Sequence, residues 1–114
     1  MGEAPRLRVV FFKTEHGREP VREWLKSLPR ADQKEVGSDI LAVQYGWPLG
    51  MPLVRKLEED LWEVRSTLDK RIARVLFTVE GPVMVLLHGF IKKSQKTPKE
   101  DLDVAKTRLS QLRE

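Results

Sequence analysis

One arginine in an apolar stretch is the residue with the clearest chemical implication in this sequence. Arg74 lies in the middle of Ile72–Val79, a run fit for a buried strand. An arginine in such surroundings raises the free energy of the folded state unless an anion or a carboxylate partners it. The position therefore predicts either a site for a bound anion or an internal salt bridge, with Glu63 on the neighbouring strand as the partner.

A histidine and three lysines follow near the end of the next strand. His88 is close to the strand end, where an imidazole could transfer a proton near neutral pH as a general acid or base. The alternative is a hydrogen-bonded histidine of the core. Lys92, Lys93 and Lys96 come between this strand and the last helix, so we expect them to hold phosphates.

Other site types are excluded or weakly indicated. The chain has no cysteine and two histidines, which excludes thiolate chemistry and disfavours a multi-histidine metal site. No phosphate-binding glycine loop is present, so we expect neither a metal nor a cofactor. Tyr45 and Trp47 are candidates for stacking on bases, or for sealing an edge of the core.

The positive charge is concentrated in one part of the chain. The net charge is +4, and residues 61–99 contain eight basic side chains against three acidic ones. Such an excess favours a polyanion as the partner, since neutralising phosphates releases counterions. A cationic face that serves only solubility is the alternative.

Hydrophobic periodicity gives the elements that must position these residues. Continuous or alternating apolar runs predict strands, and apolar residues at helical spacing predict helices. Thr97-Pro98-Lys99-Glu100 has the pattern of a capping box at the start of the last helix. The expected strands are 7–12, 61–66, 71–80 and 83–91, and the expected helices are 20–28, 31–45 and one from 97 onward with Leu102, Ala105, Leu109 and Leu112 on its core face.

The order of these elements predicts an α+β fold. It reads β-α-α-β-β-β-α, which implies a twisted, mainly antiparallel four-stranded sheet with helices packed on it. One sheet face then remains for function, and strand alternation places Arg74 on that open face. At 114 residues the chain is expected to form one domain, residues 1–114. Without an apolar run of membrane length or a signal peptide, we expect a cytoplasmic protein.

Several segments together resemble a known family. Leu61-Trp62-Glu63-Val64-Arg65, Arg71–Phe77 and a Gly-Phe-x-Lys-Lys run, residues 89–93, that leads into Thr97-Pro98 resemble the phage-derived, Gp49-like branch of the RelE/HigB toxins. The earlier segments with Glu19-Pro20-Val21 and Trp24-Leu25 are also similar. The resemblance covers nearly the whole chain, and the closing pattern is its most specific part. It implies a RelE-like fold and the toxin of a bacterial type II toxin–antitoxin system.

The same resemblance implies an activity and assigns residues to it. Members of this superfamily cut mRNA on the ribosome by attack of a ribose 2′-hydroxyl on the adjacent phosphate, without a metal. Arg74 resembles the arginine that contacts the scissile phosphate. Since arginine does not release its proton, proton transfer is left to Lys92, Lys93, His88 or Glu63. The residues expected to act in catalysis are Arg65, Arg74, His88, Lys92 and Lys93, and those expected to bind RNA phosphates are Lys56, Arg71, Lys96 and Lys99.

The resemblance also implies partners, and two further functions compete with ribonuclease activity. The expected partners are the ribosome and mRNA, a cognate antitoxin with a DNA-binding domain and, through the toxin–antitoxin complex, operator DNA. One alternative is a toxin of the ParE kind, which has this fold but inhibits DNA gyrase. The other is a phage-derived nucleic-acid-binding domain without toxicity. The chain lacks the tyrosine or histidine that some relatives carry near the last helix, which leaves the general acid and base open.

Overall fold

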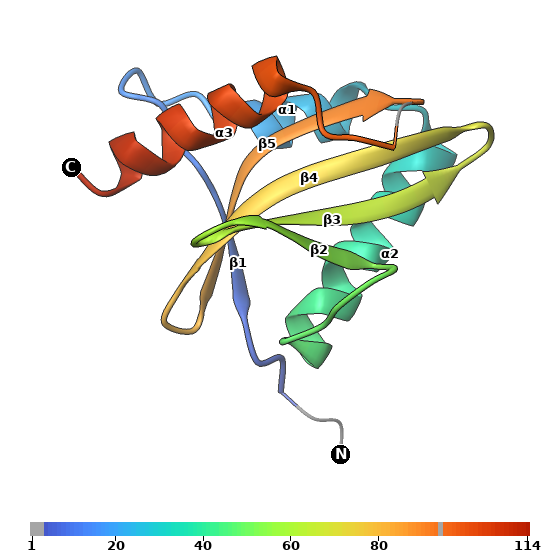
Figure 1. The fold of residues 1–114 in the computed structure, drawn as a ribbon, viewed down its shortest axis with the longest axis horizontal. Helices are drawn as coiled ribbons and strands as arrows, with labels where there is room; N and C mark the ends of the chain where they lie inside the picture. The colour runs from blue at the N-terminus through green and yellow to red at the C-terminus, as the bar shows by residue number, and fades with distance from the viewer. Residues whose placement is uncertain (1–3, 94) are drawn as a thin grey trace.

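The computed structural model describes residues 4–93 and 95–114, and it has the expected α+β architecture (Figure 1). A twisted sheet lies between two helices on one face and one helix on the other. Among the described residues, no helix is long and apolar enough to cross a bilayer. The elements are β1 (Arg8–Phe11), α1 (Pro20–Ser27), α2 (Arg30–Gly46), β2 (Val54–Glu58), β3 (Leu61–Leu68), β4 (Arg71–Glu80), β5 (Val83–Lys92) and α3 (Lys99–Leu112).

The sheet has five strands rather than the expected four, in the order β1-β5-β4-β3-β2. It is mixed, because β1 runs parallel to β5 while the other neighbours are antiparallel. The strand that the sequence did not predict is β2, Val54–Glu58, which pairs with β3. Three of its five residues are charged, so it lacks the apolar pattern of the other strands, and charged side chains are typical of such edge strands.

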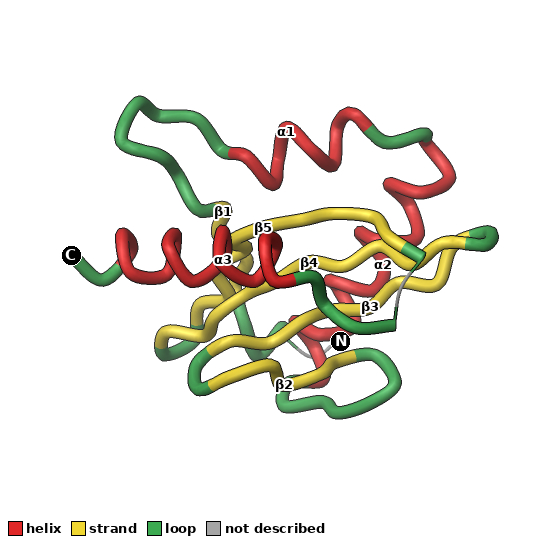
Figure 2. Tube along the Cα trace, turned by 45° about the horizontal axis from the view of Figure 1, so that its top comes forward, coloured by secondary structure: helices red, strands yellow, loops and turns green. Residues whose placement is uncertain are grey.

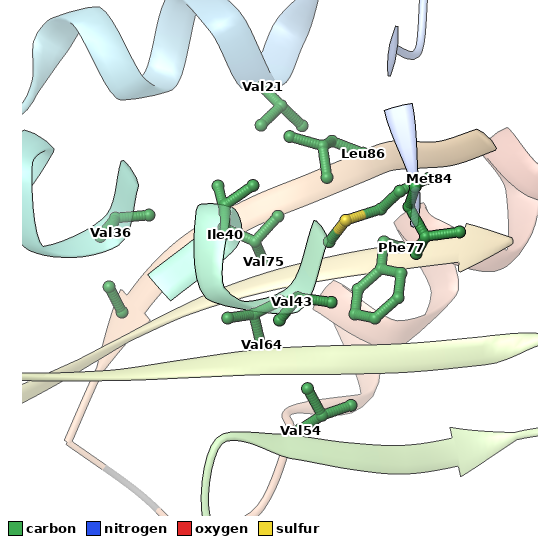
Figure 3. Close-up of a cluster of buried hydrophobic side chains, with 12 residues drawn as sticks. Val21, Val36, Ile40, Val43, Val54, Val64, Val75, Phe77, Met84 and Leu86 are labelled. Carbon is green, nitrogen blue, oxygen red and sulfur yellow. The ribbon is translucent and has the colours of Figure 1, made fainter. Parts of the chain in front are cut away.

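The face of the sheet under α1 and α2 is almost wholly apolar (Figure 3). Val21 of α1 and Val36, Ile40 and Val43 of α2 pack over it. Burial of these side chains stabilises the fold by roughly 1.5–3 kcal/mol each. The strands contribute Val54, Val64, Val75, Phe77, Met84 and Leu86 to this core.

The opposite face lies under α3, which crosses β5 and β4 in Figures 1 and 2. Its apolar cluster is smaller: Ala105 of α3 is fully buried, and Leu102 and Leu109 pack beside it. Leu112, expected on the same core face, is instead 37% exposed, so that prediction is wrong. The strands contribute Leu61, Leu76, Val85, Leu87 and Phe90.

A β-bulge in β5 changes which side chains face α3. The register between β4 and β5 shifts after Leu76, which pairs with His88, while Phe77 pairs with Leu86. Leu87 is therefore an additional residue, and it and His88 both lie on the α3 face. Gly89 then faces α1, where a Cβ atom would lie 2.3 Å from Trp24 Cε3, so only glycine fits there.

The start of α3 differs from the predicted capping box. The helix begins at Lys99, and the residue at its N-cap is Pro98, which makes no side-chain cap hydrogen bond. Thr97 instead donates its hydroxyl hydrogen bond to Glu63 of β3, over 2.7 Å. The side chain expected to stabilise the helix therefore ties the chain before α3 to the sheet.

Candidate functional site

Arg74 lies on the α3 face of the sheet, opposite the helices α1 and α2. It pairs in register with Arg65 of β3, and its guanidinium is 5.9 Å from the ring centre of Phe90. The expectation that Arg74 faces an open side of the sheet is wrong, because its side chain is 0% exposed. Strand alternation gave the correct face, but α3 and the chain leading into it occupy that face as well.

Glu63 is the buried carboxylate beside this arginine. It is 0% exposed, and its Oε1 lies 3.7 Å from Arg65 Nε. Burial lowers the pKa of Arg74, whereas attraction by Glu63 raises it. Thr97 donates to Oε2, but Oε1 has no hydrogen-bond partner among the described residues. The alternative of an internal charge pair with Glu63 is thus present as an electrostatic attraction between Glu63 and Arg74.

A third arginine belongs to the same group and was missed from the sequence. Arg55 of β2 pairs in register with Glu63, which places the two residues on the same face. Together with Arg65 it lowers the pKa of Arg74, as a like charge does. We call Arg55, Arg65, Arg74 and Glu63 the arginine cluster. Its three cations and one anion leave an excess of positive charge on the α3 face.

Arg65 gives the arginine cluster access to solvent and to ligands. Its side chain is 12% exposed, and its Nη2 donates 2.9 Å to the side-chain oxygen of Gln95 and 3.5 Å to the Gln95 carbonyl. These two acceptors stand where an anionic oxygen would bind a guanidinium. A phosphate that replaced Gln95 would gain charge-assisted hydrogen bonds from Arg65.

His88 is held by neighbours on both sides of its ring. Nε2 is 2.7 Å from Asp101 Oδ1, and Nδ1 is 3.5 Å from Arg108 Nη1. Burial lowers the pKa of His88, while the bond to Asp101 raises it. Arg108 also donates 2.8 Å to the Leu87 carbonyl, at the bulge. The arrangement matches the hydrogen-bonded core histidine that the sequence left as the alternative, and neither ring nitrogen is available to a substrate.

Lys92 is also paired. Its ammonium lies 3.3 Å from Glu100 and 3.5 Å from Asp101. The hydrogen bond to Glu100 raises the pKa of Lys92, so this lysine does not become a base near neutral pH. Lys93, Lys96 and Lys99 are exposed on the segment between β5 and α3 and at the start of α3.

Residues 23–110 match the family described as Phage derived protein Gp49-like (DUF891). The chain belongs to this family. It is a family of RelE-like toxins, so the Gp49-like chain has the context of a toxin–antitoxin toxin. No curated protein matches it.

Two of the predicted phosphate-binding residues lie away from the arginine cluster of this Gp49-like chain. Arg71 makes a two-oxygen contact with Asp32 of α2, at 3.0 and 3.2 Å, on the opposite face of the sheet. Lys56 lies over the ring of Trp62, 5.9 Å from its centre, and 3.9 Å from Glu59. Neither side chain approaches Arg74.

The two aromatic candidates differ in role. Trp47 seals an edge of the apolar core, with its ring against Trp62 at 5.1 Å and Phe77 at 5.6 Å between centres. Tyr45 is exposed at the end of α2, on the other side of the sheet from the arginine cluster. Within residues 4–93 and 95–114, no group of three or more acidic or histidine side chains could hold a metal ion.

Proposed function

We propose that this Gp49-like chain is a toxin that cuts mRNA on the ribosome as a metal-independent endoribonuclease. The supporting observation is the arginine cluster, in which three arginines surround one buried carboxylate that has an unused oxygen. A phosphate that gains negative charge in the transition state is stabilised by fixed cations in a site of low dielectric constant. The family supports the toxin context, and the arginine cluster supports the chemistry.

The reaction needs three roles. The ribose 2′-oxygen forms a bond to the adjacent phosphorus, the bond to the 5′-oxygen breaks, and a 2′,3′-cyclic phosphate and a 5′-hydroxyl result. One group must accept the 2′-hydroxyl proton, another must give a proton to the 5′-oxygen, and cations must hold the phosphate. Arg65 would hold the phosphate in the place of Gln95, with Arg74 and Arg55 adding positive charge behind it.

Glu63 is the strongest candidate for the base. Its Oε1 accepts no hydrogen bond from a described residue, although Arg65 Nε lies 3.7 Å away as an ion-pair partner. RNA must displace the contacts of Gln95 and Thr97 to reach this oxygen. The exposed ammonium of Lys93 is then available to protonate the leaving oxygen, since His88 and Lys92 are engaged.

We also propose the partners of this chain and the cellular compartment in which it acts. A cognate antitoxin would keep the toxin inactive, and its DNA-binding domain would bring the pair to operator DNA. The ribosome and mRNA would meet Lys93, Lys96 and Lys99, which are exposed between the end of β5 and the start of α3, where Gln95 contacts Arg65. All of these partners are found in the cytoplasm, which is where we propose that the chain acts.

The test uses a reconstituted translation extract, a defined mRNA and mapping of the 5′ ends of the fragments. Arg65→Gln and Glu63→Gln should each lower the rate of ribosome-dependent cleavage by about 10²-fold or more. Arg18→Gln removes the same charge at the exposed pair with Glu23 and should cleave at the wild-type rate. Equal rates in all variants, or no cleavage by folded wild-type protein, would overturn the proposal.

The burial of the arginine cluster favours a second candidate, inhibition of DNA gyrase without cleavage. Both Arg74 and Glu63 are 0% exposed, as expected of charges that organise a fold rather than a reaction. A supercoiling assay with purified gyrase distinguishes the two functions. Inhibition that persists in Arg65→Gln, together with intact mRNA in the extract, would establish the binding toxin instead.

A further inference from the structure

The outer side of α2 and the loop that follows it form an uncharged, exposed surface. Residues 40–54 are the longest run without a charged side chain, in a sequence in which 33% of the residues are charged. Leu41, Tyr45, Leu49 and Met51 from this run are 51%, 42%, 36% and 61% exposed, and we call them the α2 patch. Only two other large hydrophobic residues of the described chain are as exposed. Aromatic residues and methionine without charges are typical of the centre of a protein–protein interface.

The exposed side of α2 presents its residues in a fixed order. With about 3.6 residues per turn, Lys34, Leu41 and Tyr45 lie along one stripe of the helix. This stripe points away from the buried Val36 and Val43, which face the apolar core. Lys34 is exposed and forms no ion pair with another described residue. The stripe therefore offers an unpaired cation in the first half of α2 and an exposed aromatic ring near its end.

Gly37 leaves an open space beside this stripe. A Cβ atom added there would have no heavy atom within 4 Å, and the residue does not have a positive φ. A glycine within a helix destabilises the helix, because it loses more conformational freedom on folding than other residues do. No contact within the described chain requires glycine at this position. The exposed Leu41, one turn further along α2, has a side chain that would fill such a space on a second molecule.

Both features fit a second copy of the chain in one arrangement. When two identical helices pack antiparallel about a two-fold axis, the same surface supplies both halves of every contact. If Leu41 of each copy lies over Gly37 of the other, the axis passes midway between these two positions. A contact between Lys34 of one copy and Tyr45 of the other places the axis at almost the same point, and there the ammonium meets the face of a ring. The stripe is thus complementary to itself.

The charges around the α2 patch also favour antiparallel packing of two copies. This packing places Arg30 and Lys34 of the two copies at opposite ends of the interface, whereas parallel packing would bring these like charges together. Glu35 and Asp39 lie beside the stripe, in a cleft between α2 and the edge formed by β2 and β3. Arg6, just beyond the end of α2, donates to a main-chain carbonyl over 3.1 Å. Like charges are therefore kept away from the centre of the interface.

We propose that two copies of this chain associate in solution through α2, with the α2 patch buried at the centre of a two-fold interface. Leu49 and Met51, on the loop after α2, would extend the apolar contact at both ends of the paired helices. This association does not depend on the proposed ribonuclease activity, because the arginine cluster lies on the α3 face, on the other side of the sheet from α2.

The test is sedimentation velocity of the full chain over concentrations of about 1–500 μM. The 13.2-kDa chain should shift reversibly to twice its mass as the concentration rises, and the shift should persist at high salt because the contact is mainly apolar. Leu41→Lys puts two charges beside the axis and should weaken association by about tenfold or more. The matched change Leu112→Lys, at a 37% exposed leucine of α3, should leave association unchanged. Lys34→Gln removes both cation–ring contacts and should weaken association about tenfold.

Cysteine cross-linking tests the position of the axis, since the chain has no cysteine of its own. In a mixture of the Ser38→Cys and Leu41→Cys variants, oxidation should give a mixed disulfide-linked dimer, because these positions face each other across the axis. Ser110→Cys, exposed on α3, should not cross-link under the same conditions. A monomer at all concentrations, a folded Leu41→Lys variant that associates like the wild type, or equal cross-linking of Ser110→Cys would each overturn the proposal.

Discussion

The two faces of the sheet receive side chains from the same three central strands, yet they bury different chemistry. The face under α1 and α2 contains Val64, Val75 and Phe77 in one continuous apolar core. The face under α3 buries Glu63 and Arg74 between its apolar side chains. Burying charges costs more free energy than burying hydrocarbon, even when the charges are paired.

The two faces differ in what they contribute: one stabilises the fold, and the other is the candidate for function. The apolar face follows the expected rule that hydrophobic burial drives folding. The α3 face retains groups that hydrophobic residues of similar volume could replace, often without loss of stability. Buried charges with such a cost are candidates for function, and this is the physical reason for proposing that the activity lies on the α3 face.

The largest expected effect comes from the apolar face. Phe77→Ala removes a fully buried ring that contacts Trp47 and Trp62, and it should lower the free energy of unfolding by about 3–5 kcal/mol. Urea denaturation followed by tryptophan fluorescence measures the change. The specific activity of the remaining folded protein should be unchanged, and a loss of activity in fully folded protein would contradict the division between the two faces.

A smaller effect is expected from removing a charge on the α3 face. Arg74→Met leaves Glu63 attracted by Arg65 and Arg55, so the free energy of unfolding should fall by about 1–3 kcal/mol. The double variant Arg74→Met with Glu63→Leu should recover most of that loss while remaining inactive. Urea denaturation of both variants is the measurement. A double variant no more stable than Arg74→Met would show that hydrophobic residues cannot replace these charges without loss of stability.

The smallest effect is a pH dependence on the α3 face. Because burial lowers the pKa of His88 in the folded protein, the unfolded state binds the proton more readily. The contribution of His88 to stability is complete above its unfolded pKa of about 6.5 and is lost as the pH falls below that value. Relative to His88→Gln, the wild type should therefore lose stability as the pH falls from about 7 to 5. If the free energy of unfolding changed with pH in the same way in both proteins, the lowered pKa of His88 would be contradicted.

Most of the fold could be predicted from the sequence because its strands and helices have clear periodicity. The expected strand 71–80 matches β4 at both ends, and the expected antiparallel arrangement is confirmed for β3, β4 and β5. The exception is β2, whose residues alternate but are mostly charged, so that its pairing with β3 decides its structure. The parallel pairing of β1 with β5 depends on long-range packing that local patterns do not contain.

The candidate site could be predicted less well, because burial and partners depend on the tertiary structure. Strand alternation gave the face of Arg74, but it gave no sign that α3 covers this face. Asp101 was missed because its partner His88 is reached only across the packed α3 and β5. Arg55 could have been found only after β2 was recognised as a strand.

The bulge at Leu87 reverses the alternation of side chains between the two faces of the sheet along β5. Before it, the even-numbered residues Met84 and Leu86 face α1 and α2, whereas after it His88 and Phe90 face α3. If Leu87 instead paired regularly with Leu76, every later residue of β5 would change faces, and His88 would take the place of Gly89 against Trp24, where only a hydrogen atom now fits. Deleting Leu87 would keep His88, Gly89 and Phe90 on their present faces. The extra residue therefore decides which face of the sheet each side chain from His88 to Lys92 occupies.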